Sequence, residues 1–306
     1  MLNELVIERT GTPFVRTVVR LWRGVPRLEI THVLDRTALP PVPREQHSQW
    51  HFFGFPLSLT ANGVQLRAEG PLGFRRVPED SLPGATVDKF AAQRVVDLRE
   101  GAGYGVTLAS RQAAVWQING PSLSAPKPWA DRVLMSTALS HALEGITKDQ
   151  GLTKFDAPLE PGAPREQVFD YALTANATFD AVAAERFGRE FAVPLRAVTL
   201  PKPMFPRRTA KFREPSGSFL RVEPEGVEWL TLRPATGLEN AFLLRLRNPR
   251  DREAEAMVTL PIHVVSAQSC DLLGRPLSKG ELSEINPLRL RVGPRGIATA
   301  LVQVKE

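Results

Sequence analysis

The sequence predicts an all-β protein built from β-sandwiches. Its 306 residues contain 27 Pro and 22 Gly, which divide the chain into short segments bounded by turn residues. Within these segments hydrophobic and polar residues alternate with a period of two, as they do along a strand with one buried face. Convincing helical patterns are few. Many short strands separated by frequent turns are typical of a β-sandwich.

In chain order, the alternation predicts nine strands in the first two-thirds of the chain and six in the last third. The first nine are residues 5–9, 15–22, 27–34, 52–59, 64–67, 93–98, 105–110, 113–118 and 168–174. The last six are residues 219–223, 227–233, 242–247, 256–260, 288–292 and 297–304. Asn62-Gly63 is a strong hairpin pattern because both residue types tolerate positive φ, so we expect 52–59 to pair with 64–67.

One helix is predicted, at residues 178–191. Thr178 is the expected N-cap, and Val182, Phe187 and Phe191 fall on one face. Gly188 is expected to interrupt the helix and to limit it to two or three turns. Residues 133–143 are ambiguous, because their leucines fit either a helix or a strand followed by a loop.

The chain is expected to contain two folded units. Residues 201–217 are rich in Pro and basic side chains and show no alternation, as is typical of a linker. The predicted units are therefore a large β unit at residues 1–200 and a small β-sandwich at residues 218–306.

Composition excludes several classes of protein. The 39 Lys and Arg against 33 Asp and Glu give a net charge of +6, but the basic residues are not clustered with interleaved aromatics, so we expect no nucleic-acid partner. No long apolar run predicts a membrane span, and residues 1–5 do not resemble a signal peptide. The single cysteine, Cys270, excludes an internal disulfide and is expected to be buried. We therefore expect a cytoplasmic protein.

No motif identifies an active site. The histidines form no metal-binding motif, and residues 101–105 are Gly-rich but lie between two predicted strands, where a β-turn is expected. Asn176-Ala177-Thr178 is read as a chance match to a glycosylation acceptor. A glycosidase needs two facing carboxylates, and the candidates, each expected to be a surface acid, are Asp88, Asp97, Asp131, Asp156 and Asp170.

The tryptophans divide into two groups. Trp116 and Trp229 lie within alternating strands and are expected in the core. Trp50 and Trp129 border loops rich in Pro or polar residues, where an exposed ring could stack on a sugar.

The order of the segments resembles the C-terminal β region of family 38 α-mannosidases. The resemblance spans nearly the whole chain, although each motif is weak by itself. Val168 stands where that family has a histidine. The segments that carry it are residues 21–30 (LWRGVPRLEI), 33–35 (VLD), 52–57 (FFGFPL), 93–98 (QRVVDL), 105–108 (GVTL), 168–173 (VFDYAL), 191–195 (FAVPL), 244–249 (LRLRNP), 271–274 (DLLG) and 297–304 (IATALVQV).

This resemblance implies a galactose-mutarotase-like β super-sandwich followed by a small C-terminal β-sandwich, with at most one or two short helices. In the family, both lie behind a catalytic domain that carries the zinc and the nucleophilic aspartate. That domain has no counterpart in these 306 residues. We therefore expect no catalytic or metal-binding residue and no cofactor in this chain, with zinc only in a catalytic domain of the full-length protein or of a partner chain.

Two function classes remain open. The first is the non-catalytic β region of an α-mannosidase, inactive alone and in contact with a mannose-containing saccharide. The second is a free-standing carbohydrate-binding or mutarotase-like sandwich, which would need a histidine and a carboxylate converging in its concavity. For sugar contact the candidate residues are Trp50, His51, Trp129 and Arg165, the last at the end of a stretch (145–165) corresponding to the family's cleft-side loop.

Overall fold

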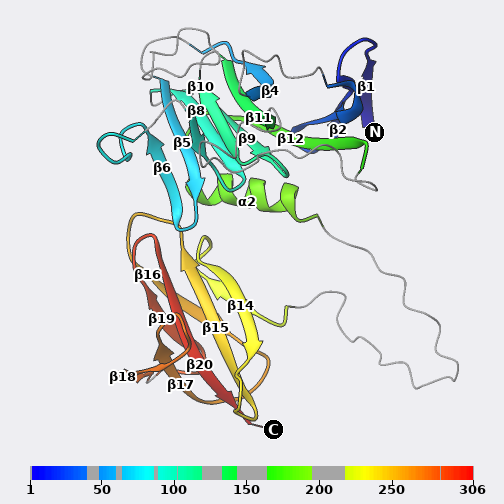
Figure 1. Ribbon diagram of the computed structural model, residues 1–306. Coiled ribbons are helices and arrows are strands. Elements are labelled where there is room, and N and C mark those ends of the chain that lie inside the picture. Colours follow the sequence, from blue (N-terminus) through cyan, green and yellow to red (C-terminus); the bar gives the residue numbers. More distant parts are fainter. Residues whose placement is uncertain are drawn as a thin grey trace, which may run out of the picture. The chain divides into compact units, whose positions relative to one another are not determined.

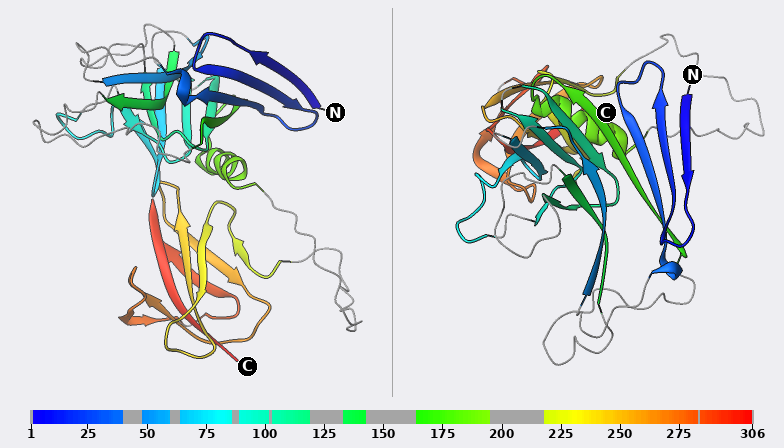
Figure 2. Two further views of the ribbon diagram at one scale, coloured as in Figure 1. Left: turned by 45° about the vertical axis from the view of Figure 1, so that its right-hand side comes forward. Right: turned by 90° about the horizontal axis from the view of Figure 1, so that it is seen from above.

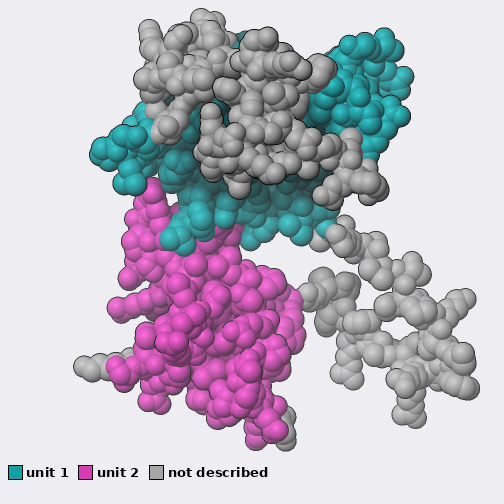
Figure 3. Space-filling model, in the orientation of Figure 1, with its two compact units in different colours: residues 1–194 teal, residues 195–306 magenta. Residues whose placement is uncertain are grey.

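The structure is a computed structural model that describes residues 2–39, 48–59, 64–85, 89–101, 103–118, 133–142, 164–194, 218–282 and 284–305 (Figure 1). The described chain is mostly β-strand, which confirms the all-β class. It divides into two compact units, residues 1–194 and 195–306 (Figure 3). The predicted linker at 201–217 lies outside the described residues and stays a prediction.

The first unit contains two antiparallel sheets. The larger has eight strands in the order β1-β2-β3-β12-β9-β8-β5-β6, and the smaller has four in the order β4-β11-β10-β7. The bounds of the larger sheet are β1 Leu2–Glu8, β2 Phe14–Trp22, β3 Leu28–Asp35, β12 Glu166–Asn176, β9 Gly105–Ser110, β8 Val95–Glu100, β5 Val64–Gly70 and β6 Gly73–Val77. Those of the smaller are β4 Ser48–Pro56, β11 Val133–Ala142, β10 Val115–Ile118 and β7 Lys89–Ala91. A short 3₁₀ turn, η1 (Arg36–Ala38), follows β3.

The main core lies between these sheets. Phe53 and Phe55 from β4 pack with Trp116 from β10 and with Leu98 and Tyr171 from the larger sheet. This confirms the core position predicted for Trp116. The expected hairpin between residues 52–59 and 64–67 is wrong, because β4 pairs with β11, whereas β5 pairs with β6 and β8 in the other sheet. A turn pattern is local and does not determine which sheet the next strand joins.

The opposite face of the larger sheet is covered by α2 (Ala181–Ala192), as Figures 1 and 2 show. Ala184 and Phe191 of the helix pack on Val95, Ala109 and Ala172. Central strands are therefore buried on both faces. In β8, for example, Val96 and Leu98 belong to the main core, whereas Val95 packs in the cluster that includes the helix.

Helix α2 corrects two expectations. The N-cap is Asp180, not Thr178: its carboxylate accepts the backbone N–H groups of Val182 (2.8 Å) and Ala183 (3.3 Å). Gly188 does not interrupt the helix. A Cβ at this position would lie 2.2 Å from Val95 Cγ2, so glycine allows the helix to approach the sheet closely.

The second unit is a sandwich of a three-stranded and a five-stranded antiparallel sheet, in the orders β13-β16-β19 and β14-β15-β20-β17-β18. Its core includes Leu244, Leu246, Ala256, Leu290 and Val302. Cys270 is buried as expected, and burial raises the pKa of its thiol. The strands are β13 Arg221–Glu223, β14 Glu228–Pro234, β15 Ala241–Asn248, β16 Ala254–Thr259, β17 Val264–Cys270, β18 Pro276–Glu281, β19 Leu288–Val292 and β20 Gly296–Val304.

The ambiguous stretch at residues 133–143 forms a strand, β11. The alternation misses four strands: β6, β7, β17 and β18. Strand β7 is only three residues long, and β17 (VVSAQSC) carries polar residues that weaken its pattern. Among the described helices, none is long and apolar enough to cross a membrane.

Candidate functional site

Trp50 lies in strand β4 rather than in a loop, and the residue is 42% exposed. The Lys89 ammonium lies 4.2 Å from the centre of the indole, and the Phe52 ring is nearly parallel to it with centroids 6.3 Å apart. Such a cation–π contact partly covers the surface on which a sugar would stack. The ring is accessible, as predicted, and its role in sugar contact stays a prediction.

His51 and Trp50 are adjacent on one strand, so their side chains point to opposite faces of the sheet. The His51 ring lies edge-on to Phe14 of β2, with centroids 6.2 Å apart. The structure therefore does not bring the two predicted contact residues together. Trp129 lies outside the described residues.

Arg165, just before β12, forms a salt bridge with Asp35 at the end of β3. Its guanidinium donates to both carboxylate oxygens of Asp35, at 3.1 and 2.5 Å. Thr37 donates its backbone N–H (2.9 Å) and its hydroxyl (2.6 Å) to the same carboxylate. These hydrogen bonds, led by that from Arg165, hold the pKa of Asp35 well below its usual range. Arg165 thus has a structural partner in this unit.

His32 lies between the two sheets of the first unit. Its ring stacks on Phe53, with centroids 4.1 Å apart, and its Nδ1 lies 3.0 Å from Thr17 Oγ1. Arg9 donates to the same hydroxyl at 2.9 Å, so the hydroxyl proton is available to a neutral His32. Burial, together with the Arg9 charge, lowers the pKa of His32 to about 4. A cationic neighbour is the opposite of the carboxylate partner that a mutarotase-like site would use.

Asp97 is fully buried, which corrects its expected place on the surface. Arg99 donates to its two carboxylate oxygens, at 3.0 and 3.2 Å, and the Thr107 hydroxyl donates at 2.7 Å. Arg99 also donates to Asn176 Oδ1, and Asn176 Nδ2 donates to Thr107 Oγ1 at 2.9 Å. The Phe179 ring covers this network, with Arg67 and Arg99 over it at 4.7 and 5.8 Å. These contacts satisfy the buried charges.

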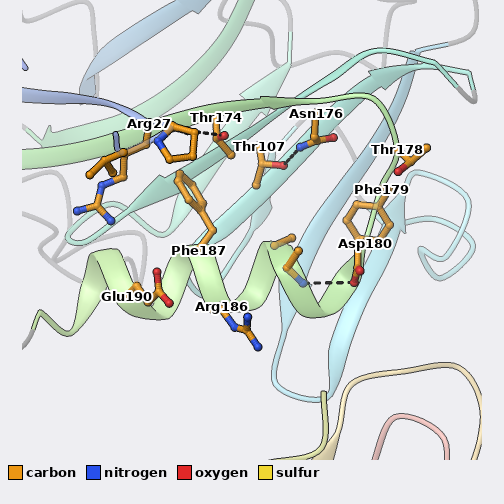
Figure 4. A pocket seen from close by; sticks show the side chains of 14 residues that line it. Arg27, Thr107, Thr174, Asn176, Thr178, Phe179, Asp180, Arg186, Phe187 and Glu190 are labelled. Carbon is orange, nitrogen blue, oxygen red and sulfur yellow. Dashed lines mark hydrogen bonds between the residues drawn. The ribbon is translucent and has the colours of Figure 1, made fainter. Parts of the chain in front are cut away.

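A pocket of about 330 Å³ opens beside this network, between α2 and the outer face of the larger sheet (Figure 4). One wall is apolar and comes from Ala183, Ala184 and Phe187 of the helix. The sheet side presents Thr107 and Thr174, which are directly opposite each other on β9 and β12. The β2–β3 turn closes a further side with Val25 and Pro26. The sequence shows no motif for this pocket, because its residues come from segments far apart in the chain.

An exposed apolar surface covers β1 and β2. Strand pairing places Leu5 opposite Val19, Val19 opposite Ile30, and Ile30 opposite the core residue Tyr171, so these side chains share one face. These four side chains form a row that extends the core-facing side of the sheet to its edge strand, β1, where Leu5 is 58% exposed. Every residue of β1 is exposed. We call Leu5, Ile7 and Leu21, which lie on this face, the β1–β2 surface, whereas Leu2, Val6 and Trp22 are exposed on the opposite face.

In the described part of the chain, no group of three or more His, Cys, Asp or Glu side chains is arranged to hold a metal ion. The described residues therefore do not fit the zinc that the resemblance implies for a catalytic domain.

Comparison with known proteins gives two kinds of likeness. Residues 226–300 match the family model described as the glycosyl hydrolases family 38 C-terminal beta sandwich domain. No curated protein matches the sequence.

Solved structures share the fold, among them two from Enterococcus faecalis. One is an alpha-mannosidase from Enterococcus faecalis V583, with a TM-score of 0.63 and 14% identity over 94% of this chain. The other is a protein in glycosyl hydrolase family 38 from Enterococcus faecalis, with a TM-score of 0.60 and 14% identity over 94% of this chain. The match covers 28% of the first and 29% of the second, so the chain spans less than a third of their length.

Proposed function

Since the chain resembles the C-terminal β region of family 38 α-mannosidases, we propose that it is the non-catalytic β region of an α-mannosidase-like glycoside hydrolase. It supports a catalytic domain, in the same polypeptide or in a partner chain, and is inactive alone. It works in the cytoplasm and contributes to contact with a mannose-containing saccharide. The family match at residues 226–300 and the shared fold support this proposal.

The observation that carries the proposal is the β1–β2 surface. Contiguous exposed apolar patches mark interaction sites in soluble proteins. Complete burial of a fully exposed Leu or Ile side chain is worth roughly 1.5–3 kcal/mol, and Leu5, which is 58% exposed, would gain about half of this at an interface. The occupant is the catalytic domain, because more than two-thirds of each similar structure has no counterpart in this chain.

The partners of the buried acids also support a non-catalytic role for this chain. In this proposal the zinc and the nucleophilic carboxylate belong to the catalytic domain, while this chain's buried acids have structural partners. Asp97 is held by Arg99, and Asp35 is held by Arg165. A carboxylate neutralised by a guanidinium in this way is a poor nucleophile and a poor general base.

The test is an assay of the purified chain on an aryl α-mannoside with added zinc or cobalt. We expect turnover no faster than the uncatalysed reaction. Turnover well above that rate, abolished by a chelator, would show that the chain is itself a catalyst.

A further inference from the structure

We propose that the pocket between α2 and the outer face of the larger sheet is a binding site for a single pyranose ring. This site is separate from the predicted contact residues Trp50, His51 and Arg165. The inference rests on the proposed function only in the choice of a mannoside as the first sugar to test.

The size of the pocket fits a small ligand. Its volume of about 330 Å³ lies at the lower end of the range for small-molecule sites. The side chains in Figure 4 line it from the helix, from the sheet and from the β2–β3 turn. A ligand there would be enclosed from three directions.

The two long walls of the pocket differ in chemistry. Phe187 and Ala183 on the helix offer an apolar surface, and an aromatic ring can stack on the C–H face of a sugar. The sheet side offers polar groups with hydrogen-bonding capacity left over. Asn176 Nδ2 carries two protons, of which Thr107 takes one, and Thr174 Oγ1 donates its proton to the Pro26 carbonyl at 2.8 Å, leaving its lone pairs to accept. A ligand with one apolar face and hydroxyls on its edge satisfies both walls.

Other classes of ligand fit less well. A purely apolar ring would leave the polar groups of the sheet wall without partners, which is unfavourable once water is displaced. An anion would meet the carboxylates of Asp180 and Glu190, which line the pocket together with Arg27 and Arg186. Arg27 is in addition paired with Glu29 at 2.7 Å. Mixed charge at the rim favours a neutral polar ligand.

The polar wall is also held rigidly. Asn176 and Thr107 are fixed by the buried Asp97–Arg99 pair, so little side-chain freedom is lost when a ligand binds. The same pair explains why these polar residues occupy the outer face of the sheet beneath Phe179.

The test is a protein-observed NMR titration of the purified chain with methyl α-D-mannopyranoside. Benzyl alcohol, an apolar ring with a single hydroxyl, is the comparison ligand. We expect saturable shifts of the Asn176 side-chain amide and of the Phe187 and Ala183 backbone amides, with a dissociation constant in the millimolar range. Benzyl alcohol should bind at least fivefold more weakly. No saturable shift at 100 mM mannoside, or tighter binding of benzyl alcohol, would overturn the proposal.

A matched pair of variants locates the site. Ala183 is exposed on the helix, so Ala183→Trp fills the pocket without disturbing the core, and Ala183→Ser leaves it open. We expect at least tenfold weaker mannoside binding for Ala183→Trp and no more than a twofold change for Ala183→Ser.

Phe187→Leu, which removes the ring but keeps apolar volume, should weaken binding about fivefold at a melting temperature close to that of the wild type. Unchanged binding in both Ala183→Trp and Phe187→Leu would place the sugar elsewhere, and neither result bears on mannosidase turnover or on docking of a catalytic domain.

Discussion

At the scale of single residues, His32 shows how the interior of the first unit sets a protonation state. The folded chain holds its pKa at about 4, against an ordinary value of 6.5, because the ring is buried and Arg9 lies nearby. Between these two values the unfolded chain binds the proton more strongly than the folded chain. Lowering the pH through this window therefore favours unfolding, and raising it restores stability.

We predict that His32→Gln flattens this pH dependence. Between about pH 7 and pH 4, the free energy of unfolding of the wild type should fall by roughly 2 kcal/mol more than that of the variant, a value reduced from the full shift because the ring is partly solvated. Urea titrations at several pH values measure the difference. Parallel curves for the two proteins would contradict the assigned protonation of His32.

Two residues show where side-chain positions could not be predicted from the sequence. Trp229 fits an alternating strand, but the structure leaves it 55% exposed on β14. Trp229 lies opposite the buried residue Leu246, but β14 is the edge strand of its sheet, where a side chain can stay accessible to solvent. Asp97 is the converse case. Its burial depends on Arg99, Thr107 and the covering ring of Phe179, and only the fold brings these together.

At the scale of elements, alternation predicted the strands that have one buried face and a clear pattern, including β2, β19 and β20. It failed where the information is not local. The Asn62-Gly63 pattern could not show that β4 and β5 belong to different sheets, and Gly188 was read as a helix breaker although it serves close packing on Val95. The pocket could not be predicted because the turn at Val25, the strand residues Thr107 and Asn176, and the helix residue Phe187 meet only in three dimensions.

The start of α2 can be tested by comparing two neighbouring positions. Asp180→Ala should cost about 1 kcal/mol of stability, because its carboxylate accepts two backbone N–H groups of the first turn. In a unit of this size such a loss lowers the melting temperature by roughly 2–4 °C.

Thr178→Ala is the matched control, because Thr178 is the cap that the sequence suggested and it makes no contact with the N–H groups that Asp180 binds. It should leave the melting temperature within about 1 °C, since substitutions away from specific contacts change stability little. A larger loss for Thr178→Ala than for Asp180→Ala in calorimetry would restore the sequence-based assignment.

At the scale of the whole molecule, the sequence predicts that residues 201–217 join two independently folded units. Limited proteolysis followed by mass spectrometry should cut first within 201–217 and release two resistant pieces, because a Pro-rich segment without a strand pattern seldom contributes to a core. Each piece should retain its β-type circular dichroism. Cleavage first inside the strands or turns of either unit, with 201–217 intact, would show that the boundary is misplaced.

The family resemblance was predictable from the order of many weak motifs, whereas the β1–β2 surface was not. Alternation at residues 5–9 and 15–22 indicates strands with one buried face, yet the structure leaves apolar side chains exposed on both faces of β1. In our proposal a catalytic domain docks on the β1–β2 surface and covers its apolar side chains.

The most direct measurement is the α-mannosidase activity of the assembly purified from native cells through an affinity tag on this chain. Our account predicts hydrolysis of an aryl α-mannoside that a chelator abolishes and zinc restores. The double variant Leu5→Asp/Ile7→Asp should reduce this activity at least tenfold, while the control Leu272→Asp/Leu273→Asp, at exposed positions of the second unit, should leave it unchanged. An assembly without zinc-dependent α-mannosidase activity, or full activity in the Leu5→Asp/Ile7→Asp variant, would contradict the account.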